Sequence, residues 1–276
     1  MKIDAHQHFW YYDPREYGWI GPEMQTLKQN HLPVNLLPLL RASGVDNTIA
    51  VQARQILEET RWLLELAAEF PFVKGVVGWV DLCSPYLLAQ LARFCSHPKL
   101  CGVRHVVHDE PDDRFMLRDD FVRGIGALAE FGLTYDLLLF PKHLPVACEL
   151  VERFPDQPFV LDHIAKPLIK DGKVSPWDQD LRRLAAFPNV YCKVSGMVTE
   201  ADWKTWSPPD FRPYLDVVFD AFGPERIMFG SDWPVCTVAG AYADVTGIVA
   251  DYVQQLSWQE QVAVWGGTAA RFYGLE

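Results

Sequence analysis

The chain contains 276 residues, a length that suits one α/β barrel of roughly 250 residues better than two large domains. Hydrophobic residues make up 49% of the sequence and charged residues 22%, as in an ordinary globular enzyme. The net charge of −11 argues against nucleic acid or an anionic membrane as a partner, because both are bound through basic patches.

Apolar, β-branched runs alternate with helix-like segments from one end of the chain to the other. Eight strands are predicted, at residues 2–6, 47–52, 73–80, 102–107, 134–139, 159–162, 190–194 and 227–229. Helices with an apolar period near 3.6 are predicted at residues 34–42, 58–69, 85–95, 120–130, 144–153, 177–186, 211–222, 241–255 and 259–272.

This alternation favours parallel βαβ units, and eight of them in this length predict a single (β/α)₈ TIM barrel over residues 1–276. An open doubly wound sheet is the second interpretation, but no glycine-rich phosphate loop follows the first strand. Residues 9–33 form the longest irregular stretch and hold Trp10, Tyr11, Tyr12, Tyr17 and Trp19. We expect this segment to lie over the barrel mouth, either as a functional lid or as simple packing.

Six cysteines are scattered among apolar neighbours without a CxxC pair, which predicts buried, reduced thiols. No apolar run approaches the roughly 18 residues of a membrane span, and no secretory leader precedes Met1. A cytoplasmic protein is therefore expected.

In barrels of this kind, chemistry collects where the strands end. His6 and His8 end the first strand and are two residues apart, so their side chains should project together. His163 follows the sixth strand and Asp232 follows the eighth. These four residues supply ligands suited to zinc or a similar divalent ion, and they would serve equally as a general base with orienting partners and no metal.

Four segments, taken together and in this order, resemble the amidohydrolase superfamily. They are residues 4–10 (DAHQHFW), 102–105 (GVRH), 161–167 (LDHIAKP) and 230–234 (GSDWP). The likeness is greatest to the amidohydrolase-2 branch, which contains sugar-acid lactonases such as L-fuconolactonase and L-rhamnonolactonase. It implies a (β/α)₈ barrel that hydrolyses its substrate at the mouth, with roles for His6, His8, His163 and Asp232.

The chain departs from the dinuclear members of this superfamily. Those members carry a bridging Lys or Glu after the fourth strand and a His after the fifth, where this chain has Arg104-His105 and Tyr135-Asp136. A second metal therefore has no ligands, and Arg104 would repel a nearby cation. The resemblance thus implies no obligatory cofactor, with one zinc ion held by His6, His8, His163 and Asp232 as the alternative.

The reaction expected from the resemblance is hydrolysis of a sugar lactone, such as L-fuconolactone. Asp232 would accept a proton from water, while His6, His8 and His163 bind the carbonyl oxygen or orient the water. Arg104 and His105 would stabilise the oxyanion or the product carboxylate. Further substrate contacts are expected from an indole face and from three polar side chains, namely Trp10, Gln52, Arg54 and Lys166.

Three other functions remain open from the sequence. A mononuclear zinc-dependent decarboxylase of the same branch would use the same ligands around one tightly held metal. A metal-dependent amide hydrolase is disfavoured by the missing dinuclear ligands, and a non-catalytic sugar-acid binder would show saturable binding without turnover. The sequence does not distinguish a monomer from a homodimer.

Overall fold

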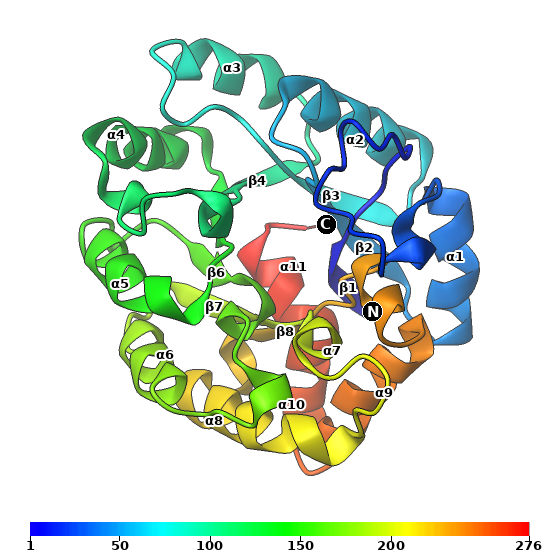
Figure 1. Cartoon of the computed structure of the whole chain (residues 1–276). Helices are drawn as coiled ribbons and strands as arrows, with labels where there is room; N and C mark the ends of the chain where they lie inside the picture. The colour runs from blue at the N-terminus through cyan, green and yellow to red at the C-terminus, as the bar shows by residue number, and fades with distance from the viewer. Residues whose placement is uncertain (276) are drawn as a thin grey trace.

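Eight parallel strands form a barrel in the computed structural model, which describes residues 1–275 (Figure 1). Each strand pairs with the next in the chain, and Gln7 bridges Trp233 in parallel to join the first strand to the segment after the last. This sequential order confirms the predicted barrel and excludes the open doubly wound sheet. The strands are β1 Ile3–Gln7, β2 Asn47–Val51, β3 Val73–Gly78, β4 Leu100–His105, β5 Thr134–Leu137, β6 Phe159–Leu161, β7 Val190–Val194 and β8 Ile227–Phe229.

Helices surround the strands on the outside of the barrel (Figure 1). They are α1 Pro33–Ala42, α2 Leu57–Glu69, α3 Leu87–Phe94, α4 Asp119–Leu128, α5 Leu144–Glu152, α6 Trp177–Ala185, α7 Met197–Glu200, α8 Arg212–Phe222, α9 Tyr242–Val253, α10 Trp258–Val262 and α11 Thr268–Phe272. The short helix α7 was not predicted, because four residues are too few to show a helical period.

The helix predicted at residues 259–272 is two helices, α10 and α11, joined by a π-helical turn at Ala263–Gly267. The turn passes close to the start of β1, where a Cβ atom on Gly266 would lie 2.7 Å from the carbonyl oxygen of Met1. Only glycine permits this approach. The apolar period runs through the turn, so the sequence pattern does not reveal the break.

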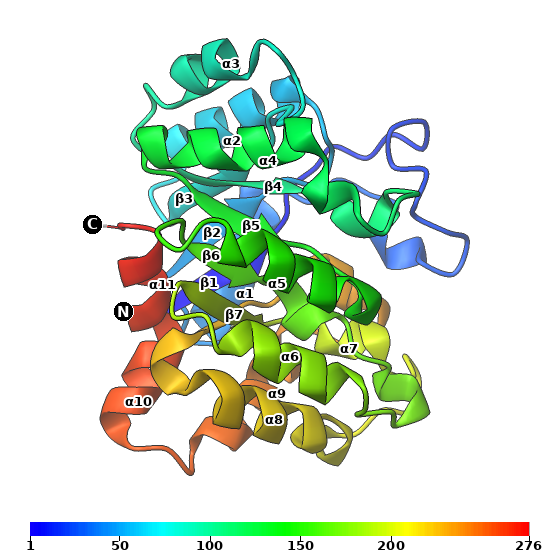
Figure 2. The ribbon, with the colours of Figure 1, turned by 90° about the vertical axis from the view of Figure 1, so that its left-hand side faces the viewer.

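The helix α11 closes the amino-terminal end of the barrel. Figure 2 shows α11 and the amino terminus at one end of the molecule, opposite the segment 9–33. Inside the barrel, Phe272 and Tyr273 pack with an apolar layer from the strands that includes Ile49, Val77 and Met228. Access to the barrel interior is therefore confined to the end where the strands terminate.

The segment 9–33 has a small core of its own, in which Trp10 packs with Tyr17, Ile20 and Leu27. Trp10 and His31 exchange two backbone hydrogen bonds of 2.9 Å, which fasten the two ends of the segment together. This segment therefore packs on itself, and Trp10 also lines the cavity described below, while its role as a functional lid stays a prediction.

No helix within residues 1–275 is long and apolar enough to cross a lipid bilayer. All six cysteines are unpaired thiols, but only Cys101, Cys192 and Cys236 are buried as expected, while the other three are half-buried.

Candidate active site

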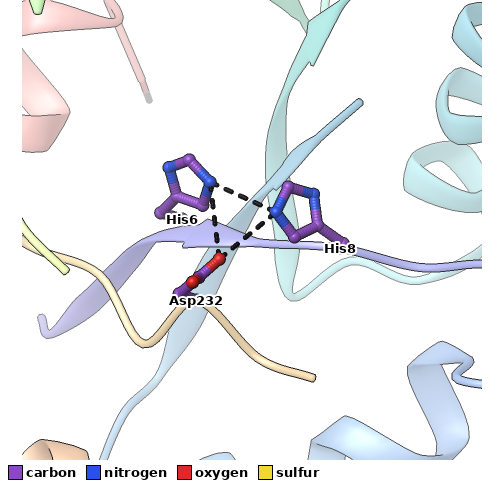
Figure 3. A group of neighbouring side chains, drawn as sticks. All are labelled: His6, His8 and Asp232. Carbon is purple, nitrogen blue, oxygen red and sulfur yellow. Dashed lines mark hydrogen bonds and ion pairs between the residues drawn. The ribbon is translucent and has the colours of Figure 1, made fainter. Parts of the chain in front are cut away.

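His6, His8 and Asp232 meet at the mouth of the barrel (Figure 3). The two Nε2 atoms of the histidines lie 3.3 Å apart, and Asp232 Oδ1 lies 3.4 Å from that of His8 and 3.9 Å from that of His6. The side chains come from β1 and from the turn after β8, which are 224 or more residues apart in sequence and adjacent in the barrel. All three are buried, so their mutual contacts replace water as hydrogen-bonding surroundings.

The turn that carries Asp232 is pinned to β1 by a second buried carboxylate. Asp4 accepts hydrogen bonds from the backbone N–H and the hydroxyl of Ser231, at 2.8 and 2.6 Å, and from the hydroxyl of Tyr242 at 3.0 Å. Asp232 itself adopts a left-handed backbone with φ of 57°, and a Cβ atom on Gly230 would lie 2.7 Å from His6 Cβ. The GSDWP motif therefore serves to bring an acid into contact with β1.

His163 reaches the same cluster from a strained turn. Residues His163, Ile164, Ala165 and Lys166 all have positive φ, between 48° and 60°. Left-handed backbone costs roughly 1–2 kcal/mol for each such residue. Burial of Ile164 and a 2.7 Å hydrogen bond from Trp177 Nε1 to its carbonyl hold the turn in place. The turn aims His163 Nε2 at Asp232 Oδ1, 3.9 Å away, while its Nδ1 lies 2.9 Å from Ser195 Oγ.

The cluster holds an ionised carboxylate, Asp232, beside the neutral imidazoles of His6 and His163. Burial would raise the pKa of Asp232, but the neighbouring His163 and the contact with His8 hold it below its ordinary range. Burial lowers the pKa of His163 to about 4 and that of His6 well below its usual value. At neutral pH, Asp232 is therefore ionised and can accept a proton, while the rings of His6 and His163 are neutral.

Two cations flank His6 from the barrel interior. Arg104 Nη1 lies 3.2 Å from His6 Nε2 and donates to Asp162 Oδ2 at 2.9 Å, while its Nη2 donates to the carbonyl of Gln52 at 2.5 Å. Lys193 Nζ lies 3.3 Å from His6 Nδ1 and pairs with Asp162 Oδ1 at 3.0 Å. Every charge in this layer is thus paired, as burial requires.

Lys193, together with its carboxylate neighbours Asp136 and Asp162, was not among the predicted site residues. A signal was present in the sequence, since charged residues of both signs stand within or directly after the apolar strands at 134–139, 159–162 and 190–194. Such residues are rarely buried without a partner of opposite charge. The sequence does not say which strands face one another, so the pairing itself is visible only in the fold.

A cavity of about 280 Å³ opens above the cluster. Its floor is polar and includes His8, Arg104, His163 and Asp232. One wall is largely apolar, with residues from the segment 9–33 and from the stretch after β8, namely Trp10, Trp19, Met24, Val235 and Val238. The lining also holds an ion pair of 2.9 Å between Lys166 and Glu200, together with Thr199 and Trp203. These dimensions and this mixture suit a small polar ligand with one apolar side.

Three predicted substrate contacts lie outside the cavity lining. His105 contacts Glu110 at 2.7 Å, accepts from Trp79 at 3.3 Å and stacks on Phe115. Its neighbour Arg104 points inward, because successive side chains of a strand alternate between the two faces. The prediction that both residues contact substrate did not allow for this alternation.

Arg54 and Gln52 also have structural partners in place of a ligand. Arg54 pairs with Glu16 and with Glu59, whose carboxylate also accepts the backbone N–H groups of residues 53 and 54. Gln52 is fully buried and donates to the Arg104 carbonyl at 3.3 Å. Gln52 therefore holds Arg104 in place through hydrogen bonds and does not reach the cavity. The predicted substrate contacts that do line the cavity are Trp10, Arg104 and Lys166.

The donors of His6, His8 and Asp232 fit one divalent ion. A tetrahedral zinc ion with bonds of about 2.0–2.1 Å separates its ligand atoms by roughly 3.3–3.4 Å, and two of the three observed separations are 3.3 and 3.4 Å. His8 Nδ1 faces the carbonyl of Val51 at 2.8 Å and so carries the hydrogen, which leaves the Nε2 lone pair free for a ligand. The guanidinium of Arg104 beside His6 works against such an ion.

Comparison with known proteins places this geometry in a family. The amidohydrolase family model matches residues 3–275. The chain is 44% identical to an L-fucono-1,5-lactonase from Burkholderia multivorans and 37% identical to one from Burkholderia ambifaria, in both cases over 100% of this chain and 96% of the relative. A crystal structure of an amidohydrolase from Burkholderia multivorans with bound zinc superposes with a TM-score of 0.96, at 44% identity and with full coverage of both chains.

Proposed function

Because the chain belongs to the amidohydrolase family, we propose that it is a lactonase that hydrolyses a sugar-acid lactone to the free aldonic acid. L-Fucono-1,5-lactone, or a closely related six-carbon aldonolactone, is the proposed substrate, because two relatives that match the whole chain are named for that reaction. The observation that carries the proposal is an ionised Asp232 surrounded by three imidazoles at the floor of a cavity of sugar size.

Asp232 and His8 are arranged to hold the attacking water. Asp232 accepts one proton of the water, and the free Nε2 lone pair of His8 accepts the other as a hydrogen bond. The water oxygen forms a bond to the lactone carbonyl carbon as its proton moves to Asp232. A positioned general base of this kind contributes about 10²–10⁴-fold in rate.

Arg104 and His163 are placed to stabilise the carbonyl oxygen as it becomes negative. Arg104 lines the cavity, so its positive charge lies beside the oxygen that becomes negative. If Ser195 donates to His163 Nδ1, the ring hydrogen is on Nε2 and is directed at the cavity. Each such donor is worth about 10²–10³-fold in turnover.

The tetrahedral intermediate collapses by breaking the bond between the carbonyl carbon and the ring oxygen. The proton held by Asp232 passes to that oxygen, which leaves a hydroxyl group and a carboxylic acid on one open-chain product and restores the Asp232 carboxylate. A divalent ion held by His6, His8 and Asp232 would add Lewis-acid polarisation of the carbonyl. An ester carbonyl is more electrophilic than an amide, so we propose that the ion is not obligatory.

The ion pair of Lys166 and Glu200 in the cavity lining is the proposed contact for the sugar hydroxyls. The face of the Trp10 indole is the proposed contact for the apolar side of the sugar ring. Acid released from a panel of aldonolactones, followed with a pH indicator with and without chelator, tests the assignment. We expect turnover of six-carbon deoxy lactones that survives chelation. Turnover of no lactone, with release of CO₂ from aromatic acids by the metal-loaded protein, would instead identify a decarboxylase.

A further inference from the structure

Lys193 has no part in the steps described so far, yet it lies at the centre of the barrel. The side chain is completely buried and comes from β7. Its ammonium group contacts Asp136 Oδ2 at 2.5 Å and Asp162 Oδ1 at 3.0 Å. The third neighbour is His6 Nδ1, at 3.3 Å. One fully buried lysine thus touches a residue of the candidate active site directly.

Lys193 is the middle member of a line of polar groups that we call the buried ion chain, made of Tyr273, Asp136, Lys193, Asp162 and Arg104. The hydroxyl of Tyr273, just after α11, donates to Asp136 and lies 2.9 and 3.1 Å from its two oxygens. At the other end, Asp162 Oδ2 accepts from Arg104 at 2.9 Å. The chain therefore runs from the closed end of the barrel to the cavity floor.

The location of these charges argues for a role beyond stability. Replacing buried ion pairs with apolar side chains is often neutral or stabilising, so folding alone does not require them. The layer directly beneath is apolar and well packed, with Ile49, Val77, Val160 and Met228. The buried ion chain instead ends on Arg104 and passes His6, the two groups closest to the proposed reaction on this side.

We propose that Lys193 is a positioning residue for lactone hydrolysis. It fixes Asp162, which donates no bond but accepts from Arg104 and lies 3.3 Å from His6 Nδ1, and so orients the guanidinium and the His6 ring. Tyr273 fixes Lys193 in turn, through Asp136. This inference rests on the proposed function, since it concerns the geometry in which Arg104 and His6 meet the lactone.

The test compares Lys193→Met with the double variant Lys193→Met/Asp136→Asn. The single variant leaves the Asp136 carboxylate buried without its cation, so a loss of activity alone would be ambiguous. The double variant removes both charges, and Asp162 keeps Arg104 as its partner. We expect the double variant to regain the wild-type melting temperature while kcat stays at least about tenfold low and KM changes less than about threefold, as for misplaced catalytic groups. Recovery of kcat together with the melting temperature would overturn the proposal.

Tyr273→Phe provides a milder variant that keeps every charge and removes only the hydroxyl contacts with Asp136. We expect kcat to fall about threefold, less than in the double variant, because Tyr273 acts on the candidate active site only through Asp136 and Lys193. Tyr214→Phe is the matched control, because its buried hydroxyl also makes two contacts, of 3.3 Å each, but to carbonyls outside the barrel. The ¹⁵N NMR chemical shifts of the His6 ring should change in Tyr273→Phe and in the double variant, and should be unchanged in Tyr214→Phe.

The two proposals fail in different ways. Wild-type protein without turnover of any lactone would remove the proposed function, and this inference with it. An active wild type, an inactive Asp232→Asn variant and a fully active Lys193→Met/Asp136→Asn variant would remove only the role of Lys193.

Discussion

Two layers of the barrel interior differ sharply although the same strands build them. The layer near α11 is apolar, with Ile49, Val160 and Met228 closed off by Phe272. One step further along the strands, the interior is filled by the charges of the buried ion chain and by His6. Val160 and Asp162 show the change within one strand end, two residues apart. The lower layer can stabilise the barrel without ligand contacts, which leaves the upper layer free to carry costly polar groups.

Among the variants that distinguish the polar layer from the apolar layer, Asp232→Asn should have the largest effect on turnover. The amide keeps the shape of the side chain but accepts no proton, so turnover of a lactone should fall by about 10²–10⁴-fold. The melting temperature should stay within a few degrees of the wild type, measured by calorimetry on the same preparation. Near-normal turnover in a folded variant would remove Asp232 from the role of base.

Met228→Ala should produce the opposite result, a loss of stability with little loss of chemistry. Met228 is fully buried in the apolar layer, and truncation of such a side chain costs about 2–5 kcal/mol of unfolding free energy. Urea denaturation measures this loss, and kcat at 25 °C should remain close to the wild-type value. A large drop in kcat in the folded variant would show that the two layers are not separable.

Arg104→Met should turn the cavity floor into a tighter zinc site. Two unit charges about 4 Å apart repel by about 4 kcal/mol at an effective dielectric constant of 20, and Arg104 Nη1 lies 3.2 Å from His6 Nε2. We expect zinc affinity, measured by titration calorimetry, to rise at least about tenfold. Arg54→Met is the control, since Arg54 pairs with Glu16 and Glu59 away from the candidate ligands. Equal zinc affinity in the wild type and Arg104→Met would contradict the proposed repulsion.

The pH profile should show a wide plateau with an acid limb. Burial lowers the pKa of His163 to about 4, so the ring is neutral from the physiological range down to that pH. Below pH 4, the protonated His163 ring carries a positive charge that offsets the negative charge of Asp232. The added proton also occupies the ring nitrogen that was an acceptor. We therefore expect kcat/KM to be level above about pH 5 and to fall towards pH 4 and below. An acid limb near pH 6.5 would mean that an ordinary, solvated histidine controls the reaction.

Stability should decline over part of the same range. The pKa of folded His163, about 4, is below the unfolded value near 6.5, so the unfolded chain binds a proton first as the pH falls. The contribution of His163 to folding is thus complete above about pH 6.5 and is lost progressively between about pH 6.5 and 4. A smaller loss of melting temperature over this interval in His163→Gln than in the wild type is the expected outcome, and an equal loss would assign the decline to other groups.

The smallest effect is expected at His105, which the sequence suggested as a substrate contact. The side chain packs outside the barrel between Glu110 and Phe115, so His105→Gln should change KM by less than about twofold, within the usual range for a residue without ligand contact. Lys166→Met, on the cavity wall, should raise KM more than this. The reverse order of the two KM values would mean that the wrong face of β4 has been assigned to the substrate.

Local patterns in the chain were sufficient to predict the architecture and to predict that four polar residues share one mouth of the barrel. Apolar runs with short periods predicted all eight strands, since backbone geometry sets those periods regardless of the tertiary partner. The spacing of His6 and His8 predicted that they project together, and the positions of His163 and Asp232 after later strands predicted that they lie at the same mouth. The structure brings these four residues together.

Tertiary structure alone decided which polar residues face one another. Arg104 and His105 are adjacent in sequence, so strand alternation places them on opposite faces, but only the closed barrel shows which of the two points to the cavity. The left-handed turn at His163 depends on burial of Ile164. The buried ion chain joins residues of β4, β5 and β7, and Asp162 directly after β6, to Tyr273 near the end of the chain. Pairing across a barrel is set by strand register and by non-local packing, which no short window of sequence contains.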